Sequence, residues 1–111
     1  MKEWEQLEQY ICEELKEIDP YIKRTPGSGN GSKKGDIYFS SNCGLHIEAK
    51  QRNKKNVWDI DWLTKCAEEI PLHSKKTPIV VSENRDGKKI VHLDAEDFFE
   101  LYKDYWRMKN E

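Results

Sequence analysis

The stretch GDIYFSSNCGLHIEAK, residues 35–50, decides the fold because it reads as two short strands around a turn. Segments 36–40 and 45–50 alternate apolar and polar side chains, and Asn42 and Gly44 between them are typical turn residues. We expect the two segments to pair as a central hairpin. The second segment is nevertheless charged, because it contains Glu48 and Lys50.

Side-chain alternation predicts that the charged residues of this hairpin share one face. If the apolar side chains face the core, Asp36, Glu48 and Lys50 lie together on the other face, which His46 also shares as an expected bystander. A three-residue turn would place Asp36 opposite Glu48, with Cβ atoms about 4.5–5.5 Å apart. Two carboxylates this close repel each other unless a cation lies between them. The pattern therefore predicts a site for Mg²⁺, with Mn²⁺ as a substitute.

The flanking segments predict helices around this hairpin. Residues 3–18 have apolar side chains at helical spacing and should form a helix that ends at Asp19-Pro20. Residues 24–35 hold four of the six glycines and predict an exposed loop. Residues 57–69 predict a second helix, which Pro71 follows.

The C-terminal part predicts a second hairpin and a third helix. The apolar segment 77–84 is followed by an Asp-Gly turn and the segment 89–93. Asp94 is expected to cap the last helix, and we expect the aromatic residues of that helix in the core: Phe98, Tyr102, Tyr105 and Trp106. The element order predicts a single α/β domain over residues 1–111, with a small mixed sheet flanked by helices.

The charges are segregated along the chain although the net charge is only −2. Residues 20–56 hold eight Lys and Arg residues against two acids, which are Asp36 and Glu48, whereas the flanking segments are acidic. A basic segment that brackets two isolated carboxylates is typical of a site for an anionic polymer such as DNA. Lys50 would neutralise charge on a reacting phosphate. The candidates for contacts with the DNA backbone are Arg24, Lys33, Lys34, Arg52, Lys54 and Lys55.

Other features favour a cytoplasmic protein without a membrane anchor. The N-terminal residues are acidic and amphipathic and do not resemble a signal peptide, and no apolar run approaches the ~20 residues of a membrane span. The three cysteines form no CxxC pair, which fits a reducing compartment and gives no zinc-ligand spacing.

The segment GDIYF…LHIEAK resembles the core motif of the PD-(D/E)xK nuclease superfamily, with Gly35 where the motif has Pro. The longer run KRTPGSGNGSKKGDIYF is similar to archaeal-type Holliday junction resolvases and small phage nucleases, in which an Arg-Ser/Thr-x-x-Ser loop precedes the Asp. Arg24, Thr25 and Ser28 match that loop. The end of the chain also resembles the phage group, in which a Val-rich strand and a hairpin lead into an EDF helix.

This resemblance implies a metal-dependent endonuclease that acts on four-way junctions or other branched DNA as a homodimer. It implies that Ser28 binds DNA and that an acid of the first helix completes the site; Glu8 fits the archaeal pattern and Glu5 the phage pattern. The implied catalytic residues are Glu8, Asp36, Glu48 and Lys50, and the implied metal ligands are Asp36, Glu48, Ala49 and Glu8. Two alternatives remain open: a repair or restriction-type nuclease for duplex or flap DNA, and an inactive DNA-binding module.

Overall fold

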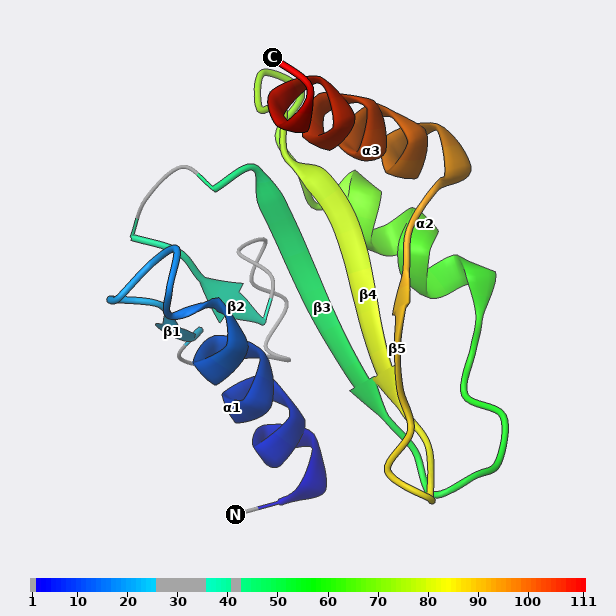
Figure 1. The fold of residues 1–111 in the computed structure, drawn as a ribbon. Coiled ribbons are helices and arrows are strands. Elements are labelled where there is room, and N and C mark those ends of the chain that lie inside the picture. Colours follow the sequence, from blue (N-terminus) through cyan, green and yellow to red (C-terminus); the bar gives the residue numbers. More distant parts are fainter. Residues whose placement is uncertain (1, 26–35, 41–42) are drawn as a thin grey trace.

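The computed structural model describes residues 2–25, 36–40 and 43–111 and arranges them as an α/β fold with three helices (Figure 1). Its main sheet has the order β3 (Leu45–Gln51), β4 (Thr77–Glu83) and β5 (Lys89–His92). Strands β3 and β4 run parallel, and β4 and β5 run antiparallel. The expected α/β class with a mixed sheet flanked by helices is therefore confirmed.

Helix α2 (Ile60–Glu68) connects the two parallel strands and covers one face of the sheet. It begins where the Asp59 carboxylate accepts the Asp61 N–H at 2.9 Å, three residues later than the sequence predicted. Cys66 is fully buried against the sheet, and its thiol contacts the carbonyl oxygens of His46 and Ile79. The helix therefore packs on the face that carries the even-numbered side chains of β3.

Helix α1 (Glu3–Leu15) covers the opposite face and builds the main core. The helix ends before residue 18, and a turn then brings the chain to the buried Asp19. The Asp19 carboxylate accepts the backbone N–H groups of Tyr21 at 3.1 Å and of Ser40 at 2.7 Å, which ties the end of the helix to the end of β2. The core cluster consists of Leu7, Ile11, Cys12, Ile22, Ile37, Ile47, Ile79 and Val81.

The predicted hairpin between segments 36–40 and 45–50 is wrong. Strand β2 (Ile37–Tyr38) instead pairs antiparallel with β1 (Lys23–Arg24), in a small sheet of two strands. Strand β3 pairs over all of its seven residues with the buried strand β4, which satisfies more backbone groups than the two residues of β2 could. Gly44 does adopt the turn conformation, with φ of 82°, whereas residues 41–42 lie outside the described part.

The C-terminal hairpin is confirmed. Strands β4 and β5 are joined through a turn in which Gly87 has φ of 81°, a conformation that glycine adopts without steric cost. The Asn84 side chain accepts the N–H groups of Asp86 and Lys88, each at 2.9 Å, and closes the turn.

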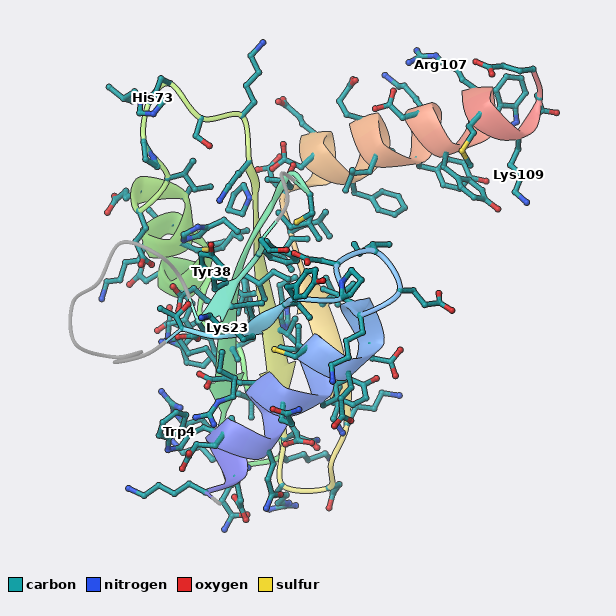
Figure 2. All side chains as sticks on the ribbon, turned by 90° about the vertical axis from the view of Figure 1, so that its left-hand side faces the viewer. Trp4, Lys23, Tyr38, His73, Arg107 and Lys109 are labelled. Atoms are coloured by element: carbon teal, nitrogen blue, oxygen red, sulfur yellow. The ribbon has the colours of Figure 1, made fainter. Side chains whose placement is uncertain are left out.

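Helix α3 (Ala95–Lys109) begins as predicted, because the Asp94 carboxylate accepts the Glu96 N–H at 2.9 Å. The expectation that its aromatic residues belong to the core is wrong, because none of its residues is buried. Figures 1 and 2 show the helix leaning away from the sheet, with Arg107 and Lys109 at its far end. Its exposed apolar residues, each 43–62% exposed, are Phe98, Phe99, Leu101, Tyr102, Tyr105, Trp106 and Met108.

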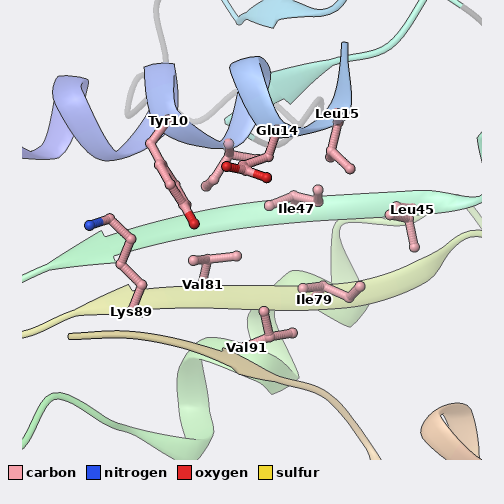
Figure 3. A pocket seen from close by; sticks show the side chains of 10 residues that line it. Tyr10, Glu14, Leu15, Leu45, Ile47, Ile79, Val81, Lys89 and Val91 are labelled. Carbon is pink, nitrogen blue, oxygen red and sulfur yellow. The ribbon is translucent and has the colours of Figure 1, made fainter. Parts of the chain in front are cut away.

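An apolar groove of about 280 Å³ lies between α1 and the sheet (Figure 3). Tyr10, Glu14 and Leu15 line it from the helix, and side chains of all three strands form its floor. None of the helices in the described ranges is long and apolar enough to cross a membrane.

Candidate metal centre

Asp36 and Glu48 meet at the free edge of β3, although their segments do not form the expected hairpin. The Asp36 N–H donates to the Ile47 carbonyl at 3.0 Å, and the Asp36 Oδ2 accepts the Ala49 N–H at 2.7 Å. These two hydrogen bonds bracket Glu48, and its side chain also hydrogen-bonds to the Asp36 side chain. The predicted contact between the two carboxyl groups is therefore present.

Glu69 is a third carboxylate at this point, and the sequence interpretation missed it. It caps the C-terminal end of α2 and hydrogen-bonds through its side chain to Glu48. One signal was available, because acids are unfavourable at the negative end of a helix dipole and this helix ends in Glu68 and Glu69. An acid retained there is a candidate for contact with a cation.

Glu48 has a strongly raised pKa within this cluster. Burial, followed by the charge of Asp36 and the hydrogen bonds with Glu69 and Asp36, raises the pKa of Glu48 to about 9. Burial disfavours the charged form, and nearby negative charge disfavours it further. The cluster consequently retains a proton near neutral pH in the absence of a cation, and a divalent cation could replace that proton.

His46 lies two residues before Glu48 on the same face of β3 and is only 5% exposed. Its Nε2 atom is buried and has no hydrogen-bond partner among the described residues. A ring nitrogen of His46 and carboxylate oxygens of Glu48 and Glu69 all lie within 4.8 Å of one another. Burial lowers the pKa of His46, which favours the neutral imidazole.

Lys50 follows on the same face, as the alternation of β3 predicted. Its ammonium lies 5.8 Å from the centre of the Trp62 ring, and the Arg52 guanidinium lies 5.5 Å from the same ring. Trp62 therefore holds two cations beside the carboxylate cluster through cation–π contacts.

Two acids of α1, Glu5 and Glu8, contact Arg24. Glu8 is 1% exposed and accepts the Arg24 Nε–H at 2.9 Å, while Glu5 binds the same guanidinium at 3.0 Å. Both candidates for the helix acid thus contact one arginine, and Arg24 is held by protein carboxylates. The neighbouring Thr25 N–H donates to the Asp36 carbonyl at 2.9 Å, which connects this group to the residue directly before β2.

The predicted DNA contacts have different surroundings. Ser28, Lys33 and Lys34 lie outside the described residues. Arg52, Lys54 and Lys55 are exposed on the segment after β3. The backbone of that segment is anchored, because the Lys54 carbonyl accepts the Arg85 N–H and the Lys55 carbonyl accepts the Asn84 side chain, both at 3.0 Å.

Comparisons with protein-family models, with curated proteins and with solved structures found no match.

Proposed function

We propose that this chain is a metal-dependent endonuclease that hydrolyses phosphodiester bonds in branched DNA, as Holliday junction resolvases do. The observation that carries the proposal is the contact of Asp36 and Glu48, in a cluster where Glu48 resists ionisation. Carboxylate oxygens that lie together at the edge of β3 are suitable ligands for a divalent cation that prefers oxygen. Asp36 and Glu48 would therefore hold Mg²⁺ or Mn²⁺. When bound, such an ion polarises a phosphodiester and lowers the pKa of a water molecule.

Residues around the two carboxylates would position the site, stabilise charge and bind DNA. The Ala49 N–H fixes the Asp36 carboxylate at 2.7 Å. Lys50, which lies on the Glu48 face, would neutralise charge that develops on the phosphate. Arg52, Lys54 and Lys55, exposed on the segment after β3, would bind the DNA backbone.

Cleavage of a labelled four-way junction and of a matched linear duplex, with Mg²⁺ or with EDTA, tests this function. We expect paired nicks near the branch point that require Mg²⁺, and a loss of about 100-fold or more in rate for Lys50→Ala, the typical cost of removing one charge-stabilising donor. Lys88→Ala, in the exposed turn between β4 and β5, is the control and should cleave at the wild-type rate.

Other outcomes would select one of the alternatives. Cleavage of the duplex but not of the junction would indicate a repair or restriction-type nuclease. Tight junction binding without cleavage in either condition would refute the enzyme and leave a DNA-binding module.

A homodimer is part of the proposal, because two symmetric nicks require two active sites. The exposed apolar side of α3 supports this proposed homodimer. At about half of the 150–250 Å² that an aromatic side chain can bury, its five rings and two aliphatic side chains expose on the order of 700 Å². Stable interfaces bury about 800 Å² per partner, so a second copy of this helix would suffice to cover it.

Trp106→Glu is expected to convert the dimer into a monomer, because a charge would be buried in an apolar contact. Sedimentation equilibrium from about 1 to 100 μM protein measures the mass, and circular dichroism confirms that the helix content is retained. Lys103→Glu, which changes charge at a residue ion-paired to Glu100, should leave the dimer intact. A wild-type protein that is monomeric at the highest concentration would contradict the proposed dimer.

A further inference from the structure

A second set of possible ligands lies between β3 and the end of α2, beside the Asp36–Glu48 pair. It consists of His46, Glu48 and Glu69, whose ligand atoms lie within 4.8 Å of one another. Two opposite ligands of one ion lie about 4.2 Å apart when each bond is about 2.1 Å long. If the widest pair lies on opposite sides of the ion, it would therefore have to close by no more than about 0.6 Å.

His46 provides an observation that is independent of the acids. Burying a ring nitrogen without a hydrogen bond costs free energy, so such groups are rare, and a bound ion is one of the partners that can satisfy them. The Nε2 of His46 is such a group among the residues that the structure describes. The backbone of His46 is also held in place, because its carbonyl contacts the Cys66 thiol of α2 at 3.5 Å. The buried imidazole beside two carboxylates thus presents a ring nitrogen that no described residue satisfies.

We propose that His46, Glu48 and Glu69 bind one first-row transition-metal dication, of the class of Mn²⁺, Fe²⁺, Co²⁺ or Zn²⁺, in preference to Mg²⁺. Imidazole is a good ligand for these ions, whereas Mg²⁺ prefers an octahedron of oxygen atoms. The inference rests on the proposed function in one respect, because Glu48 would be shared with the Asp36 site. It assigns Glu69 and His46, which come from α2 and from the start of β3, as metal ligands.

Co²⁺ is the probe, because its visible absorption reports its ligands and calorimetry reports its affinity. Untagged, metal-free protein at pH 7.5 would be titrated with Co²⁺ and, separately, with Mg²⁺. We expect wild type to bind Co²⁺ at least ~10-fold more tightly than Mg²⁺, in the order that nitrogen ligands impose. His46→Leu and Glu69→Gln should each weaken Co²⁺ binding at least ~10-fold and change the absorption spectrum, while Mg²⁺ affinity falls less than about twofold for His46→Leu.

The controls are His73→Ala and Glu68→Gln, which change an exposed histidine and the exposed acid next to Glu69. Both should bind Co²⁺ as wild type does. Circular dichroism verifies folding, and Glu69→Gln decides the outcome if His46→Leu does not fold. Unchanged Co²⁺ affinity and spectrum in the folded variants would overturn the proposed site.

The experiment separates this inference from the nuclease proposal. Mg²⁺-dependent cleavage with no effect of His46 on Co²⁺ binding would leave the nuclease and remove the second site. Co²⁺ binding that depends on His46 and Glu69, in a protein that cleaves no DNA, would support the metal site and refute the nuclease.

Discussion

A Glu48→Gln protein is expected to cleave branched DNA at least about 1000-fold more slowly than wild type, and yet to be more stable when metal is absent. The first effect follows from the loss of a carboxylate shared by the proposed metal sites, and a 1000-fold loss corresponds to about 4 kcal/mol of activation free energy. The second follows from removing a group that resists ionisation beside Asp36 and Glu69. Opposite effects on activity and stability are typical of residues retained for function.

The pH dependence of the metal-free protein gives the sign of the stability effect. Glu48 has an ordinary pKa of 4.5 in the unfolded chain and about 9 in the folded one. The folded state therefore holds the proton more tightly, so this contribution to the free energy of unfolding is complete below pH 4.5 and is lost as the pH rises through 9. The groups facing Glu48 are Asp36, Glu69 and His46.

The full pKa shift of Glu48 would correspond to about 6 kcal/mol, and its partial contact with water reduces this to on the order of 2 kcal/mol. In EDTA, the melting temperature of wild type should therefore decrease as the pH is raised from 5 to 9. At pH 9, the melting temperature of Glu48→Gln should be about 10 °C higher than that of wild type. Glu68→Gln, which changes an exposed acid of α2, is the control and should follow wild type. Addition of Mg²⁺ at pH 8 should stabilise wild type by mass action but not Glu48→Gln. Identical pH profiles for the two proteins would contradict the description of the cluster.

Local signals in the sequence correctly predicted the elements that depend on neighbouring residues. The cap of α3, the Asp-Gly hairpin and the alternation within β3 all result from interactions over a few residues. Alternation alone placed Glu48 and Lys50 on one face of the strand, whatever the partner of that strand proved to be. The predicted contact between Asp36 and Glu48 is present without the hairpin, because Asp36 forms hydrogen bonds with the backbone of Ile47 and Ala49 on either side of Glu48.

Contacts between residues far apart in the sequence could not be predicted from such local signals. Strand β3 pairs with β4, which is about thirty residues away, whereas side-chain alternation indicates a strand without indicating its partner. Glu69 is remote from Glu48 in the sequence and is brought to it only because α2 packs across the sheet. Helical periodicity in α3 indicated an apolar face without indicating what covers that face, so Phe98 and Trp106 were wrongly assigned to the core.

Arg24→Met is expected to lower the free energy of unfolding by about 3 kcal/mol, because it leaves the buried Glu8 carboxylate without the cation that binds it at 2.9 Å. The pKa of Arg24 is raised chiefly by its hydrogen bond with Glu8, which agrees with a guanidinium that stabilises this carboxylate. Urea unfolding followed by circular dichroism measures the change. The neighbouring Lys23→Met is the matched control, because Lys23 is exposed and contacts only the Tyr38 ring at 5.3 Å among the contacts that the structure records for it. It should lie within about 0.5 kcal/mol of wild type.

A second substitution separates this structural role of Arg24 from a role in binding DNA. Glu8→Gln removes the buried charge, so adding it to Arg24→Met should recover at least half of the lost stability, a coupling that a double-mutant cycle quantifies. If Arg24 instead acts mainly on phosphate, Arg24→Met would keep wild-type stability and weaken junction binding with a smaller salt dependence. Glu5 and Glu8 bind the Nη2 and Nε atoms of Arg24, so a contact with DNA would use the guanidinium N–H groups that these acids do not occupy. A protein that loses stability on Arg24→Met and regains it with Glu8→Gln would establish that the first helix and β1 are joined through this ion pair.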